Sequence, residues 1–523
     1  MSDNTEDCAG SGGALVGPGT LFPSDEPRLP YDVLYELARH IYHSGSRSSL
    51  FALMSTCRTL SNACATVLLS GKVNIGKTLR LVSSFCAFVL RRESRASSIR
   101  HLHIRTVDTW PFADITISSV MYALSLVITR ATRLETLHIT EVDHFLSISP
   151  DIGPAISSLT TLTHLKLEWI GIKAQAMCMD MHSPISTVVL HNLEASGILD
   201  PDPTVLLQNF QDTLVDVTID IQPILERPVW VFSGASFPHV RSLKLVTRSV
   251  YQELLPFMKA FPNVSTFHWR DDRPYPTHWL PMLDQSHAYH LAATHGHWPE
   301  LSVLNAPMLS CYIAGLQSRV RRYSMTIVGS GGDQWYQARL NSLLRLIRPF
   351  ALWLQTSAAL FFNRDVMGWF PVSSIKELRL KISTESVPAS KAQYLMELVP
   401  YALRRMSLTS LVLTIQHIAE REEFYMVMID GTPVEDHPSA KDPFYNYLDN
   451  TALVTTARLL ADYIPTLEDV FLGIKLSENY QGPFRSYYVN LQVRRDEHGS
   501  RHFRLVKRQD SASLFDFNWG EPS

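Results

Sequence analysis

Apolar residues recur along this chain with two different spacings, and the change between them divides it. The first spacing is helical and begins after Leu29-Pro30. It places apolar residues on one predicted helix face at Val33, Leu34, Leu37, Ala38 and Ile41. After a Gly/Ser break at residues 43–49, a second helical run places on one face Leu50, Leu53, Met54, Cys57, Leu60 and Cys64. A unit of about 45 residues buries too little surface to be comfortable alone, so we expect it to have a partner.

From residue 99 the pattern becomes Φ-x-x-Φ-x-Φ, where Φ is apolar. The strong copies are Ile99/Leu102/Ile104, Leu134/Leu137/Ile139, Leu162/Leu165/Leu167, Ile185/Val188/Leu190, Leu214/Val217/Ile219, Val240/Leu243/Leu245, Val264/Phe267/Trp269, Ile375/Leu378/Leu380, Leu408/Leu411/Leu413 and Leu467/Val470/Leu472. Weaker copies lie at Leu301/Leu304 and Val320/Tyr323/Met325. From Leu137 to Phe267 the middle Φ advances by 28, 23, 29, 26 and 24 residues. Such steps, each with one short strand, are typical of leucine-rich repeats.

The segments between these strands have helical patterns, and several end in a proline just before the next copy. The predicted helices are 122–131, 251–260, 338–347, 392–405 and 451–463. Proline ends a helix and favours extended geometry in its predecessor. Helix and strand repeated in one direction predict a parallel sheet with right-handed crossovers.

Two regions depart from the repeat. Residues 271–300, rich in His, Trp and Pro, are predicted to be a loop insertion. Residues 487–493 and 502–506 alternate around a turn and predict a C-terminal β-hairpin. The expected organisation is a disordered tail at 1–28, a helical module at 29–70, an α/β solenoid at 71–480, the hairpin within 481–508, and a loose tail at 509–523.

Composition excludes several classes of protein. The chain has 523 residues, is 46% hydrophobic and 19% charged, and has a formal net charge of −3. This is a globular composition, and the charge argues against a protein that coats nucleic acid. No apolar run is long enough to span a membrane, and the acidic, Gly-rich start is not a secretory signal. Six scattered cysteines without a C-x-x-C pair indicate reduced thiols in the cytoplasm or nucleus.

The helical module resembles an F-box. The residues that carry the resemblance are Leu29, Pro30, Val33, Leu34, Leu37, Ile41, Leu50, Leu53, Cys57 and Arg58. The remainder resembles the irregular leucine-rich repeats of F-box proteins, particularly those abundant in fungi. Two features depart from the family pattern. Leu60 stands where the family often has Trp, and the Asn that usually follows each repeat strand is replaced by residues such as Val142, Ile170 and Leu193.

The resemblance implies a substrate-receptor subunit of an SCF-type (Skp–cullin–F-box) ubiquitin ligase. The ten residues named above would dock on a Skp-family adaptor, and the solenoid would hold the substrate. Such a subunit performs no chemistry and needs no cofactor; it supplies proximity. The alternative is a non-catalytic leucine-rich-repeat scaffold or adaptor that acts outside a ubiquitin ligase. The helical module could also serve simply as a cap on the solenoid.

Residues between the Φ positions should face the open side of the sheet, where solenoids bind partners. Most of these residues are polar, with many cations and histidines. The candidate substrate-binding residues are His103, Arg105, His138, Lys166, Glu168, Lys244, His268 and Arg270. We expect them to bind a protein substrate with acidic or phosphorylated groups. The alternatives are ordinary solvation of an exposed face, or a binding site on the 271–300 insertion or the hairpin.

No catalytic or metal-binding motif is present. His287, His290, His295 and His297 have plausible metal spacing, but the segment lacks the H-E-x-x-H pattern of zinc proteases. We expect a polar surface segment there. The Gly-rich stretches 10–13 and 329–332 lack the Lys-Ser/Thr of a phosphate loop, and no G-x-S-x-G elbow occurs.

Overall fold

The computed structural model describes most of the chain between Pro30 and Val506. The described residues are 30–76, 78–105, 115–193, 202–221, 232, 234–247, 253–271, 280–327, 334–362, 374–384, 394–418, 428–429, 432–433, 450–477, 485–496 and 501–506. The two predicted tails, the Gly-rich stretches, Leu29 and part of the 271–300 segment lie outside them. The chain forms two compact units, Met1–Gly71 and Lys72–Ser523. The division lies beside the boundary expected between helical module and solenoid.

The first unit contains three helices, α1 (Tyr31–His43), α2 (Arg47–Met54) and α3 (Arg58–Ser70). They enclose a small apolar cluster of buried Ala38, Leu50, Cys64 and Val67. Partly buried side chains pack against this cluster: Tyr35, Ile41, Tyr42, Leu53, Met54 and Leu68. The predicted apolar positions on the helices thus make up most of the core of this unit.

The second predicted helical run is interrupted, and the interruption has a local cause. The hydroxyls of Ser55 and Thr56 donate to the carbonyls of Ala52 and Leu53, which closes α2. Cys57 is extended, and its Sγ accepts a hydrogen bond from the Leu60 amide at the start of α3. Side chains that bond to nearby backbone groups compete with helix continuation, so one predicted helix becomes two.

The second unit is built on one sheet of sixteen strands in sequence order, β1 to β13 followed by β16, β17 and β18. The strands are β1 (Lys72–Ile75), β2 (His101–Ile104), β3 (Thr136–Ile139), β4 (His164–Ile170), β5 (Thr187–Leu193), β6 (Asp216–Ile221), β7 (Ser242–Thr247), β8 (Thr266–Asp271), β9 (Glu300–Asn305), β10 (Arg319–Ile327), β11 (Ala351–Ser357), β12 (Glu377–Ser383), β13 (Ser410–Ile418), β16 (Asp469–Ser477), β17 (Arg485–Arg495) and β18 (Arg501–Leu505). Neighbouring strands pair in parallel from β1 to β16. A separate antiparallel pair is formed by β14 (Met428–Ile429) and β15 (Thr432–Pro433).

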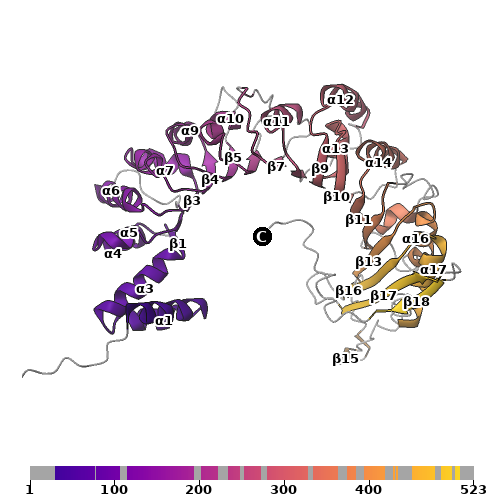
Figure 1. Cartoon of the computed structure of the whole chain (residues 1–523), viewed down its shortest axis with the longest axis horizontal. Helices are drawn as coiled ribbons and strands as arrows, with labels where there is room; N and C mark the ends of the chain where they lie inside the picture. Colours follow the sequence, from indigo (N-terminus) through magenta and orange to yellow (C-terminus); the bar gives the residue numbers. More distant parts are fainter. Residues whose placement is uncertain are drawn as a thin grey trace, which may run out of the picture. The chain divides into compact units, whose positions relative to one another are not determined.

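Helices connect successive strands and lie along one face of the sheet (Figure 1). They are α4 (Leu79–Leu90), α5 (Glu93–Ala96), α6 (Ile115–Arg130), α7 (Val142–Ile148), α8 (Ile152–Ser157), α9 (Ile172–Met179), α10 (Pro203–Leu207), α11 (Leu255–Ala260), α12 (Leu280–Ala293), α13 (Met308–Ile313), α14 (Gln334–Ile347), α16 (Leu395–Leu403) and α17 (Asn450–Tyr463), with 3-10 turns η1 (Gln208–Phe210) and η3 (Ala358–Phe362). The predicted α/β architecture with a mostly parallel, solenoid-like sheet is confirmed.

The Φ positions form the core of this unit. Every Φ residue of the strong copies is buried, as are those of the two weaker ones. The middle Φ residues pair directly across neighbouring strands, as in Leu102↔Leu137 and Leu378↔Leu411. One ladder of apolar side chains therefore runs in register from Val73 on β1 to Val470 on β16. The register read from the sequence is confirmed.

Within the parallel part of the sixteen-stranded sheet, two strands were not recognised from the pattern. In β11, Leu352 and Leu354 occupy the second and third Φ positions, but buried Pro349 occupies the first. In β1, Val73 and Ile75 pair with Leu102 and Ile104, but Ser70 stands at the first position. Both strands nevertheless pair in register with their neighbours and join the ladder.

The prediction of a loop at 271–300 is wrong. Residues Leu280–Ala293 form α12, which lies between β8 and β9 where the repeat requires a helix. The apolar residues of α12 do not recur on a single face, so sequence periodicity gave no sign of a helix. The segment belongs to the regular helix–strand alternation.

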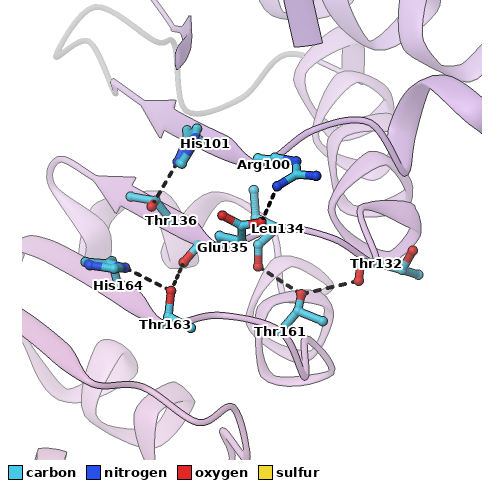
Figure 2. Close-up of polar contacts among 9 residues, drawn as sticks. All are labelled: Arg100, His101, Thr132, Leu134, Glu135, Thr136, Thr161, Thr163 and His164. Carbon is cyan, nitrogen blue, oxygen red and sulfur yellow. Dashed lines mark hydrogen bonds and ion pairs between the residues drawn. The ribbon is translucent and has the colours of Figure 1, made fainter. Parts of the chain in front are cut away.

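Hydroxyl side chains link consecutive repeats where the strands begin (Figure 2). Thr161, Thr213 and Thr466 each precede a first Φ residue, and each donates to the carbonyl of the first Φ residue in the preceding repeat, at 2.9, 2.8 and 2.6 Å. A second set consists of the residues directly after a first Φ residue, and each donates to the carbonyl of the equivalent residue in the preceding repeat. This set is Thr163, Ser186, Ser265 and Thr409, at 3.2, 3.2, 3.3 and 3.1 Å.

The chain leaves β3, β4 and β5 through a left-handed residue at equivalent positions, Glu141, Trp169 and Asn192 (φ 49, 59 and 53°). The next residues are Val142, Ile170 and Leu193, which stand where the expected Asn is missing, and all three are buried. At these three positions a buried apolar side chain stands in place of the expected Asn. The residue before it turns the backbone by adopting the left-handed conformation.

At the C-terminal end, β17 pairs antiparallel with β16 and β18 with β17. Arg501↔Arg495 and Phe503↔Val493 are paired positions, so the predicted hairpin is present and extends the sheet. Among the described residues, Cys57, Cys64, Cys86, Cys178 and Cys311 are free thiols. No described helix has the length and apolarity needed to cross a membrane.

If the apolar ladder holds the sheet together, truncation of one of its members should be costly. We expect Leu243→Ala to lower the free energy of unfolding by about 2–5 kcal/mol, because the fully buried side chain leaves a cavity. The neighbouring outward-facing Ser242→Ala is the matched control and should change it by less than about 0.5 kcal/mol. Urea unfolding monitored by circular dichroism would measure both. Equal midpoints for the two variants would contradict the ladder.

Candidate functional site

The sheet face opposite the helices carries one continuous row of side chains, here called the middle row. It consists of the residues between the second and third Φ positions, which the strand register places side by side. They are Asn74, His103, His138, Lys166, Val189, Thr218, Lys244, His268, Asn305, Ser324, Trp353, Arg379, Val412 and Phe471. The row contains three permanent cations and three histidines but no carboxylate.

Most predicted substrate-binding residues fall on this row or beside it. His103, His138, Lys166, Lys244 and His268 belong to the row itself. Glu168 and Arg270 lie two residues further along β4 and β8, paired with His191 and Val246. Arg105 follows β2 and its amide donates to the carbonyl of Ile75. The fold therefore gathers all eight onto one face.

On β1 to β4 the row forms a stacked and hydrogen-bonded group. The rings of His103 and His138 stack with centroids 3.8 Å apart and an interplanar angle of 10°. His103 Nδ1 lies 3.1 Å from Asn74 Oδ1, and His138 Nε2 lies 2.9 Å from Glu168 Oε1. The same Glu168 oxygen accepts a hydrogen bond from Lys166 Nζ at 2.9 Å. Lys166 is therefore already ion-paired, so it is a poorer anchor for an anionic ligand than the sequence suggested.

Burial controls the titration of this group. His103 is 4% exposed, and burial, reinforced by the charges of His138, Arg105 and Lys72, lowers its pKa to about 4. Burial also lowers the pKa of His138, although its hydrogen bond to Glu168 acts in the opposite direction. Burial alone would raise the pKa of Glu168, but hydrogen bonds from Lys166 and His138 lower it. At neutral pH the two stacked rings are uncharged beside an ionised carboxylate.

Further along, His191 on β5 makes a similar pair with Asp220 on β6, with Nδ1 and Oδ2 3.1 Å apart. His101 Nδ1 and Thr136 Oγ1 lie 3.0 Å apart (Figure 2). Many polar groups of strands β1 to β6 thus pair with one another, although His103 Nε2 and Asp220 Oδ1 are buried without a hydrogen-bond partner.

From β7 to β12 the face has a different character. We call Lys244, His268, Arg322, Trp353 and Arg379 the cationic cluster. The guanidinium carbons of Arg322 and Arg379 lie 4.8 and 4.3 Å from the Trp353 ring centroid. Two groups at these distances from one point are within about 9 Å of each other and repel.

Burial is the largest influence on the pKa values in the cationic cluster, and neighbouring charges add to it or oppose it. Burial lowers the pKa of Arg379, Glu377 opposes that change, and the charge of Arg322 adds to it. Burial also lowers the pKa of His268, with contributions from Lys244 and Arg322. The His268 Nδ1 atom is buried without a hydrogen-bond partner. Among the described residues, Lys244 and Arg322 make no ion pair.

Trp353 and Arg322 are site residues that sequence reasoning missed. Trp353 was missed because β11 was not recognised, although Pro349-x-x-Leu352-x-Leu354 fits the pattern once proline is allowed at the first position. Arg322 lies on β10, one of the weaker copies, and pairs with Ala351.

The predicted adaptor-binding residues divide by burial. Pro30, Val33, Leu37, Cys57 and Arg58 are exposed, with Val33 at 48% and Leu37 at 42%. Leu34 and Leu50 are buried, and Ile41 and Leu53 are half-buried against the apolar cluster of the first unit. Leu29 lies outside the described residues. Exposed Tyr31 and Phe51 add to the apolar surface of α1 and α2.

In the described part of the 271–300 segment, His287 contributes to packing. The ring of His287 stacks on Tyr312 with centroids 3.9 Å apart, and the Tyr312 hydroxyl donates to Asp284 Oδ1 at 3.0 Å. Arg339 on α14 forms an ion pair with the same Asp284. These contacts join α12, α13 and α14. In the described parts of the chain, no three His, Cys, Asp or Glu side chains come together as a metal site.

Comparisons with known proteins give no assignment. No protein-family model matches the chain, and no curated protein matches its sequence.

The low pKa of His103 makes a pH dependence testable. A histidine in the unfolded chain titrates near pH 6.5, so between about pH 6.5 and 4 the unfolded chain binds a proton that the folded protein does not. The folded state should therefore lose stability as pH falls, by about 2 kcal/mol from this group between pH 6.5 and 5.

We expect His103→Gln to remove this part of the pH dependence. Urea midpoints measured at pH 7, 6 and 5 should fall less steeply in the variant than in the parent protein, whatever the variant's stability at pH 7. Parallel curves for the two proteins would show that His103 is not held neutral by the fold.

Proposed function

We propose that the chain is a non-catalytic substrate receptor of an SCF-type ubiquitin ligase. Its helical module docks on a Skp-family adaptor, and the open face of its sheet binds a protein substrate. The observation that carries the proposal is the exposed apolar side of α1, where Val33 and Leu37 lie one turn apart. A small compact unit that leaves such side chains in water gains by covering them with a partner.

The F-box resemblance supports the same division of roles. The half of the resemblance that is buried, including Leu34 and Leu50, forms the interior of the module, and the exposed half is available for docking. The second unit supports the receptor role because its polar sheet face is long and rich in cations. In this account the protein contributes proximity, acts in the cytoplasm or nucleus, and needs no cofactor.

The docking role can be tested with Val33→Ser and Leu37→Ser together. Each exposed side chain buried on docking contributes about 1 kcal/mol or more, so adaptor affinity should fall by about tenfold or more. The matched control is Glu36→Ala with Arg39→Ala, which removes an exposed i,i+3 ion pair from the same helix. Titration with a purified Skp-family adaptor would measure the affinities. The proposal fails if the two double variants bind equally well.

A scaffold that acts outside a ubiquitin ligase is the second candidate. It is favoured by the open face itself, which could hold a partner whether or not a ligase assembles. Purification of the tagged chain from cells separates the two functions. Recovery of a cullin together with the adaptor supports the receptor, whereas adaptor without cullin, or neither, supports the scaffold.

A further inference from the structure

From the cationic cluster we infer a specific binding site: strands β7 to β12 hold an extended acidic peptide segment that runs across them. The inference rests on the proposed function in one respect, that the open face is the substrate-binding surface. It adds which part of that face binds and what chemistry it binds. The ligand groups are oxyanion side chains, either carboxylates or phosphates, on an extended backbone.

The two halves of the face differ in whether their cations are ion-paired. On β1 to β4, Lys166 is ion-paired with Glu168, and Glu168 also accepts from His138. On β7 to β12, Lys244 and Arg322 form no ion pair with any described residue. An incoming anion would have to compete with Glu168 in the first half but not at Lys244 or Arg322 in the second.

Positive charge is crowded around Trp353. Two guanidinium groups lie over one indole ring, and the charge of Arg322 lowers the pKa of Arg379. Like charges held together in a partly buried place repel, although at Arg379 the charge of Glu377 acts in the opposite direction and more strongly than that of Arg322. An oxyanion placed between them would convert the repulsion into charge-assisted hydrogen bonds, for which guanidinium geometry is suited.

His268 has an unused hydrogen-bonding atom on the same part of the face. It lies between Lys244 on β7 and Asn305 on β9, and its buried Nδ1 atom has no partner. A ligand that approaches this row could complete the hydrogen bonding of this nitrogen. His103 Nε2 on β2 is also buried without a partner, so this feature belongs to the open face as a whole and the cations distinguish β7 to β12.

The dimensions indicate the length of the segment. Lys244 and Arg379 are five strands apart in the middle row. At about 4.8 Å between strands this is roughly 24 Å, the length of an extended peptide of about seven residues. Arg322 and Trp353 lie within this span, so anionic side chains near both ends and near the centre would each meet a cation.

The test uses the full chain and three fluorescein-labelled peptides of eight residues, measured by fluorescence anisotropy at 0.15 M salt. They alternate Glu with Ser, Gln with Ser, and Gln with phosphoserine. We expect the two anionic peptides to bind at least about tenfold more tightly than the neutral one. The tighter of the two identifies the source of the oxyanion. Equal binding of all three, or none, would overturn the inference.

Variants locate the site. Lys244→Gln, Arg322→Gln and Arg379→Gln together should weaken the tighter anionic peptide by about tenfold or more. The matched control, Arg130→Gln, Lys259→Gln and Arg345→Gln, removes the same charge from exposed positions on helices α6, α11 and α14 and should leave affinity within about twofold. Equal losses in both triple variants would mean that only overall charge matters. If the first triple variant unfolds, the double variant of Lys244 and Arg322 replaces it.

Two further results distinguish peptide binding from nucleic-acid binding and from adaptor docking. Stronger binding of an oligothymidine of eight nucleotides than of either anionic peptide would assign the cluster to single-stranded nucleic acid and overturn the peptide. The adaptor is absent from these measurements, so a failure of adaptor docking would not affect them. Conversely, failure of the peptides would leave adaptor docking, and a substrate site elsewhere, untouched.

Discussion

The second unit depends on one repeated contact, the apolar side chain at the middle Φ position pressed between the same residues of the strands before and after it. From Val73 to Val470 these side chains lie in register and are nearly all fully buried. A parallel strand slipped by one residue would turn its apolar side chains to the wrong face. Each repeat is therefore positioned by its neighbours, and the hydroxyls that bond to the preceding repeat reinforce the same register.

This constraint determines where function can be placed. Because the Φ residues and the helices occupy one face, the alternate side chains of every strand line up on the other. Variation there does not disturb the ladder, so the chain can carry a stacked histidine pair on β1 to β4 and a crowded cationic group on β7 to β12. The helical module differs from the solenoid, since its core is made within 30–71 and several of its apolar residues, including Val33 and Leu37, lie on the surface.

Much of this could be predicted from the sequence, because the ladder needs apolar residues at fixed spacing and the spacing is visible. The pattern failed where the first Φ position holds a proline or a polar residue, as at Pro349 before β11 and Ser70 before β1. It also failed at α12, whose apolar residues do not segregate to one face. The register predicted which residues share the open face, but it did not predict which side chains contact one another there. Nothing in the sequence shows that Lys166 is held by Glu168, or that two arginines meet over Trp353.

The central claim is that the open face of the sheet, and not the helical side, holds the substrate. A photo-crosslinking amino acid placed at Asn305 in the middle row, and separately at exposed Met282 on α12, tests it most directly. In cells that express the full chain, the account predicts crosslinks from position 305 to proteins other than the adaptor and only background from position 282. Crosslinks to such proteins from position 282 with none from position 305 would contradict it.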